Sequence, residues 1–339
     1  MLKAGKYPFM VDPQSYLSRI IPGRPLEILA RDRDYIELAR ARLVAALLGG
    51  GDWRPEGLTS EDEVASFYLA LAAAGKASKL ALSKFIDAEL ERARRLMEEE
   101  EEDSLFEVAW RMGLRIERRI IRMPWLVDDA GRVMYRSLNM AVRVDDVLRA
   151  TAGVASLANM FLKDGWVYLD RGGLIELILG AARRRLYGLV EELSGIDSEG
   201  LEELAFQVRV AVEEASIDEI GFIEEAVPEC IKELMEKAES EGLSEEELYV
   251  LATFLANTNA PAKVLAGILA SSGLAVGELA NVIAEVMIVK AKEFKPYNCR
   301  ELLSRGICSK CPKGGLLEGY KANVKRMVLE RGLSPRQTA

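Results

Sequence analysis

The chain has 339 residues, of which 50% are hydrophobic, 29% charged and 7% aromatic, and it carries a formal net charge of −9 with no histidine. This length suggests about two domains, and the composition is typical of a globular protein rich in helix-forming residues. Without histidine the chain cannot build a Ser/His/Asp or Cys/His nucleophilic site, or a zinc site with imidazole ligands. Any metal site must therefore use cysteines or carboxylates.

The hydropathy pattern gives no sign of a targeting or membrane-spanning segment. The longest apolar run, residues 265–275, is interrupted by serines and glycines and falls short of the roughly 20 residues that a spanning helix needs. The N-terminal residues lack the apolar core of a signal peptide. We therefore expect an intracellular, cytoplasmic protein that does not contact a membrane.

The first part of the chain has mostly helical patterns. Residues 32–48 show helical spacing and are followed by three glycines, which predict a helix end. The Thr-Ser pair at residues 59–60 precedes acidic residues, as is typical of a helix N-terminus. Two further helices are predicted at residues 64–74 and 78–97, with a break near Gly75.

Residues 114–170 have a different character. Apolar and polar residues alternate with period two at 114–117 and 140–144, and residues 165–170 form a short β-prone run. Loops are expected at Pro124 and Gly131. We predict a small α/β part here, within a helical N-terminal domain at 1–215 whose later helices are expected at 174–193 and 199–215.

The C-terminal part is also expected to be helical. Residues 216–227 are predicted to form a linker or the start of a second domain, 216–339, whose first helix begins near Cys230 after Pro228. Further helices are predicted at 248–257, 261–271, 277–293 and 319–330.

Charge is unevenly distributed along the chain. Residues 191–289 hold 22 acidic and 4 basic residues, whereas residues 290–339 hold 12 basic and 4 acidic ones. A basic segment of this kind suggests a surface for polyanions. The alternative, that the basic and acidic segments pair within one domain, stays open.

All four cysteines, Cys230, Cys299, Cys308 and Cys311, lie in the last third of the sequence. Cys308 and Cys311 are separated by two residues, a spacing that in an intracellular protein favours a metal over a disulfide. Four thiolates suit zinc or an iron–sulfur cluster. On spacing alone two alternatives remain: the three clustered cysteines could be small buried residues, and Cys230 could be an unrelated buried thiol.

Several segments, in the same order along nearly the whole chain, resemble the large subunit of archaeal and eukaryotic-type DNA primases. In the N-terminal part these are residues 7–9, 67–71 and 163–170. In the C-terminal part, where the cysteine motifs are the more specific ones, they are residues 227–234, 251–255, 295–299, 305–308 and 311–312.

The resemblance implies a mainly α protein, in which a helical N-terminal domain with a small α/β insertion is followed by a helical C-terminal iron–sulfur domain. It implies that Cys230, Cys299, Cys308 and Cys311 ligate a [4Fe–4S] cluster. The chain would be a non-catalytic regulatory subunit of the replication machinery at the nucleoid. It would bind the small catalytic primase subunit as a heterodimer and help position single-stranded DNA template, primer and initiating nucleotide.

The strand-rich region at 114–170 is where we expect the catalytic subunit to bind. The candidate apolar contacts are Trp125, Met134, Tyr135, Leu138 and Met140. Each of them could instead belong to ordinary core packing.

The sequence departs from the family pattern in two places. Residues 244–249, where the family usually has His and Arg, are acidic, and residues 313–320 lack the family's His-Pro-Leu pattern. Nucleic-acid contacts are then expected from basic residues near the C-terminus, with Tyr297 and Tyr320 as candidate base-stacking rings. These basic residues are Lys290, Lys292, Lys295, Arg300, Arg305, Lys310, Lys313, Lys321, Lys325 and Arg326. A solvated basic face is the alternative.

Carboxylate pairs occur at residues 32–34, 128–129 and 145–146, but none has the pattern of a metal-dependent nucleotidyl-transfer site on an apolar strand. No phosphate-binding glycine motif opens a helix. We do not expect the isolated chain to be catalytic. Two rival functions remain: a zinc-stabilised helical regulator that binds DNA or protein, and a component of an iron–sulfur redox enzyme.

Overall fold

The computed structural model shows a mainly helical chain with one small antiparallel sheet, as the sequence predicts. It describes residues 4–49, 53, 57–127, 129, 131–151, 157, 160–213, 220–275 and 277–333. The chain divides into two compact units, Met1–Ala205 (unit 1) and Phe206–Ala339 (unit 2). The division falls inside α9 (Glu199–Val212), upstream of the expected boundary at residue 215. The first four residues of the predicted linker, 216–219, lie outside the described residues.

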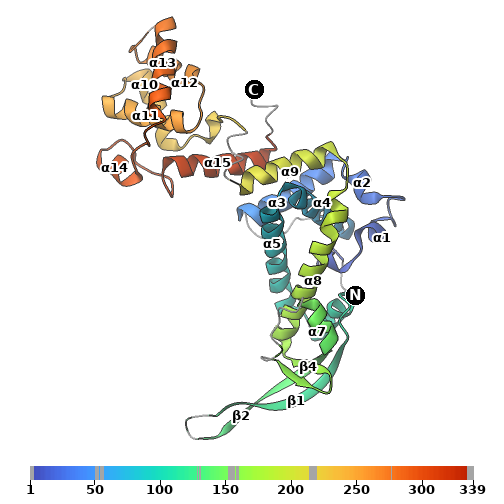
Figure 1. Cartoon of the computed structure of the whole chain (residues 1–339). Coiled ribbons are helices and arrows are strands. Elements are labelled where there is room, and N and C mark those ends of the chain that lie inside the picture. Colours follow the sequence, from blue (N-terminus) through green and yellow to red (C-terminus); the bar gives the residue numbers. More distant parts are fainter. Residues whose placement is uncertain are drawn as a thin grey trace. The chain divides into compact units, whose positions relative to one another are not determined.

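The body of unit 1 is a helical bundle. Helix α4 (Ser60–Ala77) packs against α3 (Arg33–Leu48), α5 (Lys79–Glu98) and α8 (Arg171–Ser194), as Figure 1 shows. Every residue of α4 from Val64 to Ala74 is buried. This central helix therefore has no polar face, unlike the amphipathic helices around it.

Side-chain caps set the helix boundaries. Asp32 accepts a hydrogen bond from the backbone N–H of Asp34 (2.9 Å) at the start of α3, and Gly49 ends that helix with φ +67°. Thr59 and Asp62 form a capping box at the start of α4. Both of these helix starts agree with the sequence.

The predicted break near Gly75 is wrong. The chain leaves the helix at Ser78, whose hydroxyl caps α5 by accepting from the backbone N–H of Ala81. A side chain at Gly75 would come within 2.7 Å of Cγ1 of Val190 on α8. The glycine therefore serves the close approach of two helices and does not interrupt one.

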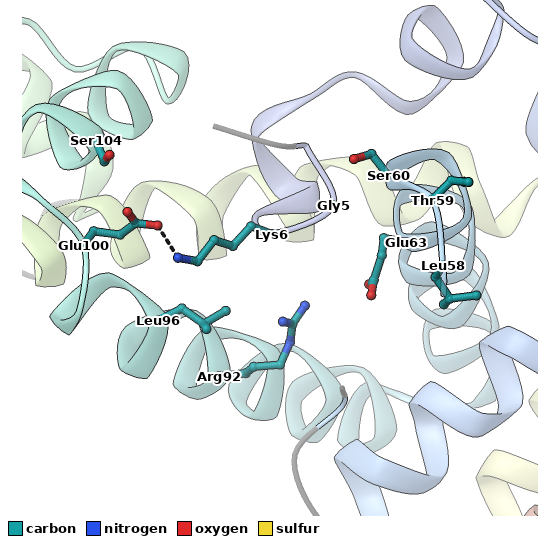
Figure 2. Close-up of a pocket in the computed structure, with 10 residues that line it drawn as sticks. All are labelled: Gly5, Lys6, Leu58, Thr59, Ser60, Glu63, Arg92, Leu96, Glu100 and Ser104. Carbon is teal, nitrogen blue, oxygen red and sulfur yellow. Dashed lines mark hydrogen bonds and ion pairs between the residues drawn. The ribbon is translucent and has the colours of Figure 1, made fainter. Parts of the chain in front are cut away.

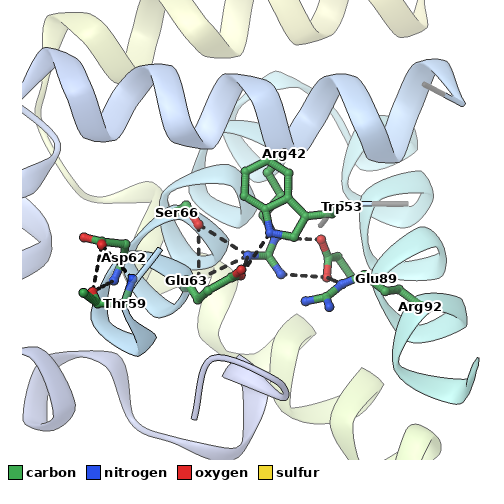
Figure 3. A network of polar contacts seen from close by, with 8 residues as sticks. All are labelled: Arg42, Trp53, Thr59, Asp62, Glu63, Ser66, Glu89 and Arg92. Atoms are coloured by element: carbon green, nitrogen blue, oxygen red, sulfur yellow. Dashed lines mark hydrogen bonds and ion pairs between the residues drawn. The ribbon is translucent and has the colours of Figure 1, made fainter. Parts of the chain in front are cut away.

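A buried charged network joins α3, α4 and α5 (Figure 3). The Arg42 guanidinium donates to both carboxylate oxygens of Glu89, at 2.7 and 3.0 Å, and to Glu63 at 2.9 Å. The Trp53 ring lies 5.2 Å from the guanidinium, and its Nε1 donates to Glu63. Burial favours a raised pKa for Glu89, but the Arg42 charge outweighs burial and holds that pKa below its ordinary value.

The predicted α/β part is a four-stranded antiparallel sheet with strand order β1-β2-β4-β3. The strands are β1 (Ile116–Val127), β2 (Val133–Arg143), β3 (Phe161–Lys163) and β4 (Trp166–Leu169). Helix α7 (Val144–Ala150) follows β2. The predicted loop at Pro124 is wrong, because Pro124 lies within β1, next to an irregularity in its register with β2. Strand β1 is at the edge of the sheet, where proline is tolerated.

The β1–β2 hairpin extends well beyond the part of the sheet that has more than two strands. Strand β2 pairs with β4 only from Met140 to Arg143, so most of the hairpin is a two-stranded ribbon. Figure 1 shows it extending away from the bundle. We call residues 119–139 the arm.

Among the described residues of unit 1, the remaining elements are short. They are a 3-10 turn η1 (Pro8–Met10) and the helices α1 (Pro13–Leu17), α2 (Pro25–Leu29) and α6 (Glu102–Arg111).

Unit 2 is a second helical cluster with its own apolar core. After the turn η4 (Glu224–Ala226) its helices are α10 (Glu229–Ser240), α11 (Glu245–Asn257), α12 (Ala262–Ser271), α13 (Glu278–Ala291), α14 (Cys299–Ser304) and α15 (Leu316–Arg331). Helix α11, buried from Val250 to Ala256, contacts α10, α13 and α15. The sequence did not predict α14. Among the described residues of both units, the helices are all too short or too polar to cross a bilayer.

Candidate metal centre

The structure brings the four cysteines of unit 2 together. Cys230 is the second residue of α10, Cys299 is the first residue of α14, and Cys308 and Cys311 lie in the turn that follows α14. The sulfurs are bonded in two pairs, Cys230 with Cys308 and Cys299 with Cys311, with Cα–Cα separations of 5.3 and 5.6 Å. A residue of the first helix of the unit thus meets residues near its end.

The two pairs share one short segment of backbone. The sulfur of Cys230 lies 2.9 Å from the carbonyl oxygen of Lys310, the residue before Cys311. The sulfur of Cys299 lies 3.5 Å from the carbonyl oxygen of Pro312, the residue after Cys311. All four sulfurs therefore surround the turn formed by residues 308–312.

The donor set fits a soft metal or cluster when the thiols are reduced. Bonded as pairs, the sulfurs are not free ligands, and within the part of the chain that the structure describes no group of three or more Cys, Asp or Glu is placed to hold a metal ion. Reduced, they are four thiols at one place, of which Cys230 and Cys308 are buried and Cys299 and Cys311 are half-buried.

Helix α15 holds this turn in place. A Cβ atom at Gly319 would lie 2.5 Å from Cγ and 2.6 Å from Cβ of Pro312, and 3.8 Å from Cγ of Pro228. These prolines follow Cys311 and precede the start of α10. The missing side chain at Gly319 thus lets α15 approach two of the cysteine-bearing segments.

Tyr320 anchors α15 to the core of unit 2. Its hydroxyl accepts a hydrogen bond from the backbone N–H of Ile223 (2.9 Å), and its ring stacks on Phe222 and meets the edge of Phe254. Burial raises the pKa of Tyr320 to about 12. Because this ring is buried, the prediction that Tyr320 stacks a nucleic-acid base is wrong.

The acidic stretch at 244–249 has structural partners. Ser244 and Glu247 form a capping box at the start of α11, and Glu247 pairs with Lys237 at 2.6 Å. Glu246 pairs with Arg305, whose guanidinium also lies 4.7 Å from the centre of the Tyr297 ring. These acids therefore stabilise helix ends and orient one of the predicted basic residues.

Eight of the ten predicted nucleic-acid contacts are exposed, and Lys321 and Lys325 are half-buried. Lys321 pairs with Glu318 at 3.1 Å, and Arg326 lies 4.0 Å from Glu330. The exposed residues are Lys290, Lys292, Lys295, Arg300, Arg305, Lys310, Lys313 and Arg326. Of these, Arg300, Lys310 and Lys313 are the nearest in sequence to the cysteines.

The predicted partner contacts divide into surface and core. Met134 and Tyr135 are exposed on the arm, whereas Leu138 and Met140 are buried in the sheet and contribute to packing. The Trp125 side chain lies outside the described residues. The arm also exposes Ile120 and Leu126, which are not among the contacts predicted from the sequence.

The carboxylate pairs noted in the sequence have structural contacts where they are described. Asp32 caps α3, and Asp146 accepts hydrogen bonds from the backbone and guanidinium of Arg115. Asp145 pairs with the same guanidinium. Asp128 lies outside the described residues.

Unit 1 contains a polar cavity of about 490 Å³ between Lys6, Thr59, Arg92 and Glu100 (Figure 2). Its charged groups already have partners: Lys6 pairs with Glu100, and Arg92 with Glu89. Glu63, which also lines it, binds Arg42. The cavity is therefore a weaker candidate for a ligand site than the four cysteines.

No model of a protein family matches the sequence, and no curated protein matches it with significance.

Proposed function

We propose that this chain is the non-catalytic large subunit of a DNA primase, in which unit 2 carries an iron–sulfur cluster. The observation that carries the proposal is the meeting of Cys230 with Cys299, Cys308 and Cys311 around one turn. The order of the four cysteine segments is also that of the resemblance to primase large subunits. In a reducing compartment, where disulfides do not persist, four such thiols are free to act as ligands.

In this proposal Cys230, Cys299, Cys308 and Cys311 hold a [4Fe–4S] cluster. A bound cluster would supply a redox-capable centre and join α10 to the turn after α14, so that its binding free energy adds to the folding of unit 2. The rest of unit 2 then supports the cluster turn through Gly319 and Tyr320 on α15.

The exposed cations around the cysteines suit a single-stranded template. Lysine and arginine neutralise phosphates, and an aromatic ring can stack a base. Arg300, Lys310 and Lys313 are exposed beside the cysteines, and the half-buried Tyr297 ring lies under the Arg305 guanidinium. These residues would position nucleic acid, leaving metal-dependent phosphoryl transfer to the catalytic partner.

The arm suits a protein partner. A two-stranded ribbon is only marginally stable in water, and this one exposes Ile120, Leu126, Met134 and Tyr135. Covering these apolar side chains would stabilise both the ribbon and a complex. We therefore place the binding surface for the small catalytic subunit on the arm.

Reconstitution with the small catalytic subunit from the same organism tests the proposal. The pair should co-elute on gel filtration and start primers on single-stranded DNA faster than the catalytic subunit alone. Tyr135→Asp should lower the affinity for the catalytic subunit at least about tenfold and so reduce co-elution. Leu80→Asp, at an exposed leucine of α5, should leave this affinity unchanged. Failure of the unaltered chain to bind the catalytic subunit or to stimulate initiation would overturn the proposal. Colourless, zinc-containing protein would instead favour the helical regulator.

A further inference from the structure

Helix α13 has an apolar stripe on its outer face. Its inner face, with Ala280, Ala284, Ile288 and Ala291, is buried in unit 2. On the opposite face Leu279, Val282, Val286 and Val289 are between 51% and 70% exposed. Isolated exposed apolar residues are ordinary, but four in a row on one helix face mark an interaction surface.

The spacing of the stripe is that of a coiled coil. Leu279, Val282, Val286 and Val289 are separated by three, four and three residues, the alternation of the a and d positions of a heptad. The stripe is a narrow seam of two a and two d positions, and it runs for about 15 Å from Leu279 to Val289. The next a position, Glu293, lies beyond the last residue of α13 and ends the seam. A seam of this kind fits another helix with the same spacing.

The charges beside the seam indicate which helix binds to it. In a parallel pair, a residue at position g lies near the e residue five positions later in the other helix. Glu285 is at a g position and Lys290 at an e position, so two copies of α13 side by side place Glu285 of each copy near Lys290 of the other. The other g residue, Glu278, meets the uncharged Ile283. In an antiparallel pair Glu285 would instead lie near Glu285 of the second copy.

We infer that α13 pairs in parallel with α13 of a second copy of this chain, forming a weak homodimer through unit 2. Two heptads bury little surface, so the dissociation constant should be on the order of 100 µM. This inference does not depend on the cluster or on the primase reading. Because Lys290 pairs with Glu285 of the second copy, it would not contact nucleic acid in the dimer.

Sedimentation of two charge variants of the full chain, alone and mixed, tests the pairing. Glu285→Lys and Lys290→Glu each place like charges across the seam and should weaken self-association about tenfold at low salt. An equimolar mixture restores both opposite-charge pairs and should dimerise like the unaltered chain. Recovery on mixing also shows that both variants are folded.

Substitutions on and off the stripe of α13 give matched controls. Val286→Asp should abolish self-association, whereas Leu80→Asp, an equally exposed apolar site on α5, should leave it unchanged. The inference is overturned if the unaltered chain stays monomeric at concentrations well above about 100 µM. It is also overturned if the charge variants dimerise normally, which indicates an antiparallel pair or another surface, or if the mixture does not recover.

Discussion

Gly319 on α15 and Pro312 beside Cys311 lie so close that a Cβ atom at position 319 would be 2.5 Å from Cγ of the proline ring. Neither the ring nor the helix backbone yields easily, since both are rigid. The contact therefore couples the last helix of unit 2 to the turn around which the four sulfurs meet.

Gly319→Ala should destabilise unit 2 by about 1–3 kcal/mol, because the added methyl overpacks this contact. Gly267→Ala is the matched control, since an added methyl on α12 meets nothing within 4 Å and should be neutral or slightly stabilising. All four tryptophans, Trp53, Trp110, Trp125 and Trp166, belong to unit 1. For Gly319→Ala, the unfolding transition of unit 2 seen by circular dichroism should therefore move to lower denaturant concentration, whereas the transition of unit 1 seen by tryptophan fluorescence should stay unchanged. Equal losses of stability for Gly319→Ala and Gly267→Ala would contradict the role given to the contact with Pro312.

Tyr320→Phe should cost unit 2 about 1–2 kcal/mol, because it leaves the buried N–H of Ile223 without its acceptor. Tyr297→Phe is the control, as it keeps the ring that lies under Arg305 and removes only a hydroxyl. Chemical denaturation of both variants measures the difference. A loss for Tyr297→Phe as large as that for Tyr320→Phe would refute the role given to the hydrogen bond.

Asp146→Asn should make unit 1 less stable at neutral pH but not in acid. Burial opposes ionisation of Asp146, but hydrogen bonds from Arg115 and Arg149 outweigh it and lower its pKa to about 2. An unfolded aspartate has a pKa of about 3.9, so the stabilisation is complete above that value and is lost as pH falls toward 2.

The difference between the unaltered chain and Asp146→Asn, followed by tryptophan fluorescence, should be about 2 kcal/mol at pH 7 and shrink below about pH 4. Asp145→Asn, at an exposed carboxylate of the same helix, should cost less than about 1 kcal/mol. A difference that does not depend on pH would show that the charge of Asp146 is not the cause.

Binding to single-stranded DNA should weaken as salt rises. If about five cations contact phosphates, the log–log slope should be roughly −3 to −4, and replacing Arg300 and Lys313 by glutamine should reduce it by about 0.7 each. Lys263→Gln, the same charge change at an exposed site on α12, should leave the slope unaltered. Fluorescence anisotropy of a labelled oligonucleotide gives the slopes, and a flat dependence would favour a solvated basic face.

Local sequence signals predicted the elements that depend on local physics. Asp32, Thr59 and Ser244 cap helices through their own side chains, and such caps can be recognised without knowledge of the fold. The roles of Gly75 and Pro124 could not be predicted in this way. Gly75 is required by Val190 on a distant helix, and Pro124 is tolerated because β1 happens to be an edge strand.

The residues of the candidate site could be predicted from the sequence, but the contacts among them could not. The spacing of Cys308 and Cys311 marks a site, yet only the packing of α10 shows how Cys230 reaches it. Likewise, the sequence shows that residues 245–247 are acidic but not that Glu246 pairs with Arg305 or that Glu247 pairs with Lys237. Tyr320 resembles an exposed stacking ring in sequence and is a core residue in the fold.

Metal and thiol analysis of the full chain, purified without oxygen, tests whether the four cysteines hold one cluster. Joint ligation by the four cysteines predicts brown protein with about four iron and four sulfide per chain, and a loss of most of both in Cys230→Ser. Protein that holds no iron and whose cysteines are all blocked as disulfides, even when alkylated directly on lysis, would contradict it.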